Sequence, residues 1–434
     1  MNISIFFDSR HLGHWEWSDF TAGNLPLSGT DGQNLALAQE LAKLGNKIHF
    51  LSTQPTTFVS DLVHLKTEDL VEAVHVSAEL KSDVLIFNNR ANLETQAGIR
   101  ECARFGQRCV LWDQNGPAIT MANVMLEGCV KRLICVSASH ADNVRDHPVF
   151  SKTEFIYNSL SPTSLVTPEQ LTIPRNPRAV CFLGSLTPSK GFHHLARVWP
   201  RVRRAFPDAE LTVIGNARLY ERHQRLGRLG VADEGYEIHG IIPYLGKTQA
   251  EAARVGVKFF GLASPREIKA ILLRSSVGVV NPNYRDSTET FCVSAAEIQA
   301  AGVAVVGGNA GGLRETVVQG RTGMLVRSEP ELEKALIRLL DDPLKAIAMG
   351  KEGAAWARTA FDRSHIALQW QNALSAAANN IAVRPPGLAW ERLTPRLLAR
   401  EFVRLSRRTP LIGHNIPTLH EFKSRFSLKR VAAQ

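Results

Sequence analysis

Short apolar runs alternate with longer stretches of helical periodicity along the chain. Apolar runs bounded by turn residues predict buried strands, and the amphipathic stretches between them predict helices. In the first half, strands are predicted at residues 3–7, 47–51, 84–87, 108–112, 133–136 and 154–157, and helices at 35–44, 91–105 and from about 138. This rhythm predicts a parallel, doubly wound sheet with helices on both faces.

A Pro-, Ser- and Thr-rich stretch at 161–178 predicts a linker, and a second alternating set follows it. Strands are predicted at 179–183, 210–214, 277–280, 303–306 and 323–326, and helices at 191–206, 266–274, 292–301, 313–318, twice within 331–359, and at 364–377. We therefore expect an α/β protein of two domains, 1–170 and 176–360, facing each other across a cleft. Ligands of such sheets bind beyond the carboxyl ends of the strands.

The charge of the chain is concentrated at one end. The net charge is +10, and residues 385–434 hold ten basic and three acidic residues. No run approaches the roughly 20 apolar residues of a membrane span. The N-terminus lacks the basic start of a signal peptide, and six scattered cysteines predict buried thiols in a reducing cytosol. We expect a cytoplasmic protein without a nucleic-acid partner.

Two acids eight residues apart mark the stretch with the most chemical content. Glu289 stands in a loop ahead of the helix predicted at 292–301, and Glu297 stands inside that helix. Backbone N–H groups of the first turn would offer an anion or hydroxyl site. On spacing alone, a capped surface helix with one solvated acid is the favoured explanation of the pattern.

Two glycine-containing turns add to this pattern. Gly29 lies in a turn that opens a helix capped by Thr30 or Asp31, where backbone can approach a phosphate. Gly184 follows a strong strand, and Lys190 then opens a helix, where a cation opposes the helix dipole unless an anion is bound. A solvated lysine in a plain turn is the alternative. No dinucleotide fingerprint or P-loop is present, and no histidines pair at metal-ligand spacing, so we predict no metal.

The ordered set of motifs resembles the GT-B-fold retaining glycosyltransferases of the family 4 type. The matching segments are Ser28-Gly29-x-Asp31, Gly184-x-Leu-x-x-x-Lys190-Gly191, Glu289-Thr-Phe-x-x-x-x-x-Glu297 and Gly311-Gly312-x-x-Glu315. The resemblance covers roughly residues 1–375 and is strongest from 179 to 326. It implies an acceptor-side first domain completed by a helix that crosses back at about 361–380, a nucleotide-sugar-binding second domain, and no metal or other cofactor.

The resemblance also implies site roles. Glu297 would hold the donor ribose, Glu289 would lie beside the sugar ring, and Lys190 would neutralise the diphosphate. Gly184 and the backbone N–H groups of Thr290, Phe291 and Cys292 would bind the donor, and Gly29 would approach it from the first domain. The acceptor would be a glycan or a lipid-linked glycan.

Three departures from the family pattern stand out. Ser185 replaces the usual Arg, for which Arg266 or Arg285 could substitute, and Cys292 replaces a glycine. The first-domain histidine near the acceptor has no match, and Asp113 is the candidate for its catalytic position, with Gln114 beside it. These departures leave open a sugar-nucleotide-binding protein that has lost catalysis, and a same-fold epimerase as a third reading.

The basic tail, 385–434, contains a helix-like stretch at 390–408. Arg392, Arg396, Arg400 and Arg404 recur every four residues, and Leu398, Phe402 and Leu405 share another side. The helix could rest peripherally on an anionic membrane at its inner face. Packing against the body of the protein is the alternative that we favour slightly.

Overall fold

The computed structural model describes the chain except residues 13–14, 58–61, 117–122, 161–163, 220–223, 285–288, 390–391, 408–415, 420 and 423–434. The strands are β1 Asn2–Phe7, β2 Lys47–Ser52, β3 Leu62–Lys66, β4 Val84–Asn88, β5 Cys109–Asp113, β6 Val130–Cys135, β7 Thr153–Phe155, β8 Ala179–Leu183, β9 Glu210–Ile214, β10 Val257–Gly261, β11 Val277–Val280, β12 Ala304–Gly308 and β13 Gly323–Val326.

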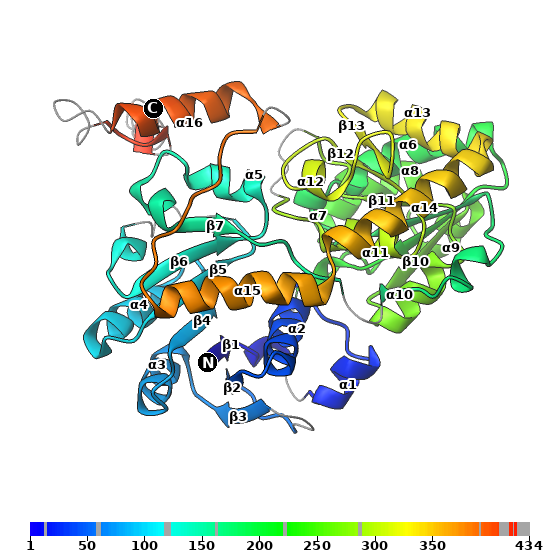
Figure 1. Cartoon of the computed structure of the whole chain (residues 1–434). Helices are drawn as coiled ribbons and strands as arrows, with labels where there is room; N and C mark the ends of the chain where they lie inside the picture. The colour runs from blue at the N-terminus through cyan, green and yellow to red at the C-terminus, as the bar shows by residue number, and fades with distance from the viewer. Residues whose placement is uncertain are drawn as a thin grey trace.

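Helices connect these strands and cover both sheets (Figure 1). The α-helices are α1 Trp17–Ala22, α2 Gly29–Lys43, α3 Leu70–Glu79, α4 Leu93–Phe105, α5 Ala138–Ala141, α6 Phe192–Ala205, α7 Glu234–Tyr236, α8 Ile242–Leu245, α9 Gln249–Arg254, α10 Pro265–Leu272, α11 Val293–Ala300, α12 Leu313–Thr316, α13 Glu329–Asp341, α14 Pro343–Ala360, α15 Arg363–Ala378 and α16 Pro395–Ser406.

Two separate parallel sheets confirm the expected fold class. The first has seven strands in the order β3-β2-β1-β4-β5-β6-β7, and the second has six in the order β10-β9-β8-β11-β12-β13. Both orders reverse direction beside the first strand of the set, between β1 and β4 and between β8 and β11. Open α/β sheets bind their ligands at such reversals, beyond the carboxyl ends of the strands.

Helix α15 returns from the second sheet to the first (Figure 1). It packs against α2 and β4, and its Trp370 meets the indole of Trp112 on β5, with ring centroids 4.7 Å apart. Arg132 on β6 donates from Nε to the carbonyl of Ala373, 2.9 Å away. The first sheet therefore completes its core with residues that follow the second one in the chain.

Several boundaries differ from the prediction. Helix α2 begins at Gly29, six residues before the expected start, and its N-cap is Ser28, not Thr30 or Asp31. The Ser28 hydroxyl accepts from the Asp31 N–H at 3.2 Å, which satisfies a free donor of the first turn. The pattern of apolar runs did not predict strands β3 and β10, which both lie at sheet edges.

Helix α16 packs on the body, the alternative that the sequence favoured slightly. Arg400 is buried and pairs with Asp146 at 2.5 Å. The outward side carries Leu398, Phe402 and Leu405. Among the described residues no helix is both long and apolar enough to cross a bilayer.

Candidate active site

A cavity lies between the two sheets at the reversal point of the second one. Its volume is about 190 Å³, and both domains contribute to its lining. Gly184 and Asn281 stand just beyond the carboxyl ends of β8 and β11. The predicted residues that line it are Gly29, Gly184, Lys190, Glu289, Thr290, Phe291, Cys292 and Glu297. The structure therefore brings together eight of the nine candidates.

Lys190 and Glu289 form an ion pair inside this cavity. The lysine Nζ lies 2.8 Å from Oε2 of the glutamate, and the Asn281 amide donates to the same oxygen at 2.8 Å. Burial raises the pKa of the Glu289 carboxyl, but the Lys190 ammonium and the Asn281 amide outweigh burial and hold that pKa below its ordinary value. Glu289 is therefore ionised at neutral pH.

The N-terminus of α11 points its first turn at the cavity. Its N-cap is Cys292, which adopts a left-handed backbone conformation with φ 73°. This conformation favours glycine, the residue of the related family at this position, and a side chain here is strained. Val293 follows, and a Cβ added to Gly29 would lie 3.2 Å from its Cγ2. Gly29 thus lets the first domain approach α11 closely.

Glu297 projects from α11 into the same cavity. The Ser164 hydroxyl donates to its Oε1 at 3.1 Å. Burial raises the pKa of Glu297 to about 7, against the smaller opposing effect of Ser164. This carboxyl therefore titrates near neutral pH, unlike Glu289.

Thr290 and Phe291 join the site to the first domain. The Thr290 hydroxyl donates to the carbonyl of Gln114 at 2.5 Å. Phe291 is 1% exposed and packs against Tyr157 and Phe361, with ring centroids 5.7 and 5.1 Å apart. Thr290 and Phe291 thus lie in the interface between the domains.

The cation expected in place of the missing family Arg is not found among the described residues. Ser185 is buried at the cavity wall, and its hydroxyl donates to the carbonyl of Asn216 at 3.3 Å. Arg266 is exposed and does not line the cavity. Arg285 lies outside the described residues.

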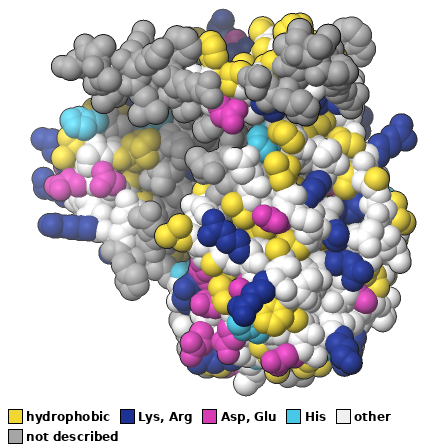
Figure 2. All heavy atoms as spheres, turned by 90° about the vertical axis from the view of Figure 1, so that its left-hand side faces the viewer, with side chains coloured by type: hydrophobic (Ala, Val, Ile, Leu, Met, Phe, Trp, Pro, Cys, Tyr) yellow, Lys and Arg dark blue, Asp and Glu magenta, His cyan; other side chains and the backbone are white. Residues whose placement is uncertain are grey.

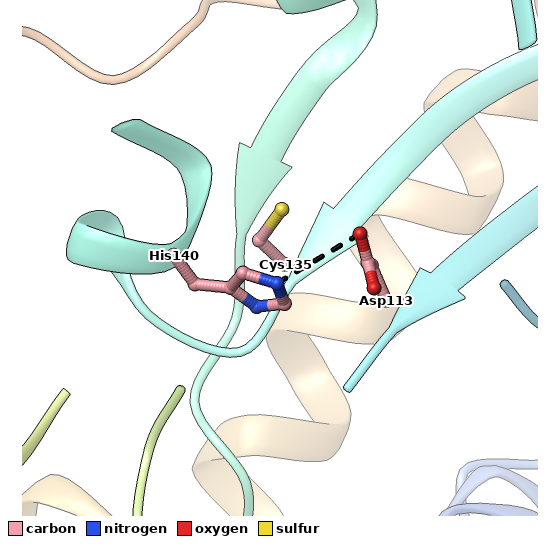
Figure 3. Close-up of side chains that lie close together, drawn as sticks. All are labelled: Asp113, Cys135 and His140. Carbon is pink, nitrogen blue, oxygen red and sulfur yellow. Dashed lines mark ion pairs between the residues drawn. The ribbon is translucent and has the colours of Figure 1, made fainter. Parts of the chain in front are cut away.

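Asp113 lies behind the cavity wall. It ends β5 and is fully buried, whereas its neighbour Gln114 lines the cavity. Its carboxylate faces Cys135 and the His140 ring, with Oδ2 3.8 Å from Nε2 (Figure 3). Burial raises the pKa of Asp113 well above its ordinary value, and burial lowers that of His140 to about 3. Burial thus disfavours the charged form of both groups, and the catalytic role of Asp113 stays a prediction.

These three side chains are a group that could hold a metal ion, with ligand atoms within 4.8 Å of one another. The imidazole argues against it. His140 Nδ1 accepts from the Val136 N–H at 3.4 Å, which places the ring proton on Nε2, the atom that would have to bind the metal. The absence of a metal stays a prediction.

Sequence reasoning missed two residues that orient the acids. Asn281 follows β11 directly and has φ 30°, and Ser164 comes from the linker. The position of Asn281 at the end of a central strand was the available signal. Nothing in the pattern pointed to Ser164, because its contact spans 133 residues of sequence.

Comparison with known proteins finds similar sequences in one family. Residues 166–356 match the model of the family Glycosyl transferases group 1. Over 192 residues the chain is 32% identical to the GDP-mannose-dependent alpha-(1-6)-phosphatidylinositol monomannoside mannosyltransferase of Mycolicibacterium smegmatis, with 44% of this chain and 45% of the relative covered. It is 30% identical over 253 residues to the glycogen synthase of Mycobacterium tuberculosis, and this alignment covers 57% of this chain and 52% of the relative. The chain thus matches about half the length of these relatives.

Solved structures match over most of the chain. Sucrose-phosphate synthase from Thermosynechococcus elongatus superposes with a TM-score of 0.61 at 18% identity, covering 85% of this chain and 97% of that one. Anabaena HepE in complex with UDP and glucose gives 0.62 at 17% identity, covering 87% and 100%. At this identity the likeness establishes the fold, which is GT-B.

Proposed function

We propose that this GT-B protein, whose second domain matches the model of the glycosyl transferases group 1, transfers a hexosyl group. The donor is a nucleotide-diphosphate sugar, the acceptor is a hydroxyl, and the transfer retains configuration without a metal. One observation carries the proposal: Lys190, Glu289, Glu297 and the first turn of α11 converge on a single cavity between two Rossmann-like domains.

Each group has a chemical task in this reaction. The leaving nucleoside diphosphate develops negative charge, which Lys190 and the N–H groups at the start of α11 stabilise. Glu297 accepts hydrogen bonds from the donor ribose, and Glu289, ionised beside Lys190, lies against the sugar ring. When the donor binds, its diphosphate replaces Glu289 as the partner of Lys190. The Glu289 carboxylate is then available to the sugar.

Residues of the first domain form the acceptor side of the cavity. Gln114 and Gly29 line the same cavity from the first domain. One relative is named for a phosphatidylinositol mannoside and another for glycogen. We take a glycan or a lipid-linked glycan as the acceptor class, with Asp113 acting through Gln114 from behind the wall.

The deciding experiment is a turnover assay with a panel of nucleotide-diphosphate sugars and glycan or glycolipid acceptors. Wild type should release nucleoside diphosphate and form product, and Glu297→Ala should lower kcat/KM by at least tenfold, because it removes a charged acceptor worth about 1.5–3 kcal/mol. Equal activity in both would contradict the assignment. Tight donor binding without turnover across the panel would favour the binding protein that has lost catalysis.

Helix α16 suits a peripheral contact with an anionic membrane. Its outward Leu398, Phe402 and Leu405 are 52%, 72% and 48% exposed, and Arg396 is exposed beside them. In the side view, hydrophobic side chains show along the upper edge of the molecule, at the height of α16 (Figure 2). Residues 385–434 carry net charge +7, which complements anionic lipid.

Co-sedimentation with vesicles of phosphatidylglycerol or phosphatidylcholine tests this contact. Leu398→Ser with Phe402→Ser should weaken binding to the anionic vesicles several-fold, since burial of each side chain in lipid is worth about 1.5–3 kcal/mol. Leu344→Ser is the matched control, because Leu344 is 79% exposed on α14. Unchanged binding of the double variant would contradict the contact.

A further inference from the structure

Helix α12, which follows the turn at Gly311 and Gly312, carries an acid that reaches the first domain. Glu315 accepts from the Ala138 N–H at 2.9 Å and from the Ser139 N–H at 2.6 Å. The hydroxyl of Tyr157 also donates to it, at 3.0 Å. One carboxylate from the second domain thus holds three donors of the first.

The turn itself is fastened to the loop of residues 289–292, which we call the donor loop. The N–H of Gly312 donates to the carbonyl of Glu289 at 2.9 Å. A Cβ on Gly311 or Gly312 would lie 2.2 Å from the carbonyl oxygens of Glu289 and Thr290, respectively, so only glycine permits this contact. The hydroxyl of Thr316 donates to the carbonyl of Phe291. Any movement of α12 therefore moves the donor loop.

First-domain residues complete the connection from the other side. The Ser137 hydroxyl donates to the carbonyl of Thr290 at 2.5 Å, and the Thr290 hydroxyl donates to the carbonyl of Gln114. Ser137 also caps α5, which presents Ala138 and Ser139 to Glu315. The donor loop is thus held between α12 and the ends of β5 and β6.

From this geometry we propose that Glu315 is a positioning residue for the transfer reaction, which fixes the donor loop against the acceptor domain. The inference rests on the proposed function. Glu315 does not line the cavity and acts through Thr290 and Glu289. A charge-assisted hydrogen bond is stronger than a neutral one, so three on one carboxylate hold α12 firmly against the first domain.

The first test separates positioning from donor binding. Glu315→Ala should lower kcat about 10- to 100-fold, because a displacement of about 1 Å at reacting groups costs about that factor. The Kd for the nucleoside diphosphate should change less than threefold, because Lys190 and Glu297 belong to the second domain. Tyr157→Phe removes one of three donors and should lower kcat only a few-fold.

Glu333→Gln is the control, because Glu333 pairs with Arg201 inside the second domain. It should leave kcat unchanged. A kcat of Glu315→Ala within twofold of wild type, with Glu297→Ala inactive, would overturn the positioning role and leave the proposed function standing.

Hydrogen–deuterium exchange gives a readout that needs no turnover. The amides of Ala138 and Ser139 should exchange at least tenfold faster in Glu315→Ala than in wild type or Glu333→Gln. Unchanged exchange would overturn the positioning role of Glu315 even if every transfer assay failed. Failure of this inference can therefore be distinguished from failure of the proposed function.

Discussion

The Nζ atom of Lys190 lies 2.8 Å from Oε2 of Glu289, so the cation assigned to the donor diphosphate is already paired with an acid of the same cavity. The two side chains are 23% and 9% exposed, which limits screening by water. A diphosphate entering the cavity competes with the glutamate for this cation. The pair keeps both charges satisfied before the donor binds.

Lys190→Ala should therefore have two effects. Donor affinity should fall about 10- to 100-fold, because a charged hydrogen bond contributes about 1.5–3 kcal/mol. The pKa of Glu289 should rise, because burial raises it and its cation is gone. Calorimetry with the donor and the pH dependence of kcat/KM measure the two effects. Lys351→Ala, on the exposed side of α14, serves as the control, and equal donor affinities in the two variants would contradict the assignment.

Donor affinity should rise between pH 6 and pH 8 through Glu297. Its pKa of about 7 leaves the carboxyl mostly protonated at pH 6, where it is a poor acceptor for the ribose hydroxyls. About a tenfold gain is expected if only the ionised form binds, because the ionised fraction rises from roughly 10% to 90%. Glu297→Gln should bind weakly and without this pH dependence. The same rise of affinity in the Gln variant would assign it to another group.

The same pKa has a consequence for stability. Folding raises the pKa of Glu297 from 4.5 to about 7, so the folded protein keeps a proton that the unfolded chain has released. Glu297 therefore contributes favourably to the free energy of folding at low pH. This contribution is lost as pH rises from 4.5 to about 7.

Asp113→Asn tests whether this acid reacts directly. The carboxyl is fully buried and its pKa is well above the ordinary value, so a neutral amide of equal size should be tolerated. We expect kcat within about threefold of wild type, since Asp113 does not line the cavity and acts through Gln114. A loss of 100-fold or more, with an unchanged melting temperature, would instead place Asp113 at the reacting atoms.

Removal of metals should leave activity intact. His140 presents a protonated Nε2 to Asp113, so the group formed with Cys135 lacks a free nitrogen lone pair for an ion. Dialysis against EDTA should change kcat less than twofold, and zinc should not raise the melting temperature. Restoration of lost activity by one divalent ion would contradict this prediction.

Arg400→Leu should destabilise the protein by about 3–5 kcal/mol, because it leaves the buried carboxylate of Asp146 without its cation. Arg396→Leu, one turn earlier on α16 and exposed, should be nearly neutral. Urea unfolding of both variants measures the difference. Equal unfolding midpoints would mean that Asp146 is satisfied by its other contacts.

Arg396 and Arg400 show which feature of α16 the sequence did not predict. The four-residue repeat predicts a basic side for α16, but it does not say that Arg400 faces the body while Leu398 and Phe402 face outward. That choice depends on Asp146, which lies 254 residues away in the chain. A single sequence gives no sign of such a pairing.

The central strands were predictable because β1, β4, β8 and β11 are buried on both faces and read as continuous apolar runs. Edge strand β3 is partly exposed and contains His64 and Lys66, so its pattern is weak. The site acids were found because they share one short segment. The contact of Glu315 with Ala138 spans 177 residues and joins two domains, so no local pattern contains it.

The return of α15 to the first sheet has a consequence for synthesis of the chain. Trp112 leaves the ribosome long before Trp370, its partner in the core. At about 5–20 residues per second the nascent first domain waits on the order of tens of seconds with that surface uncovered. Translation that ends before α15 yields a truncated product with an incomplete first domain, which is a substrate for chaperones and proteases even though the second domain has been made in full.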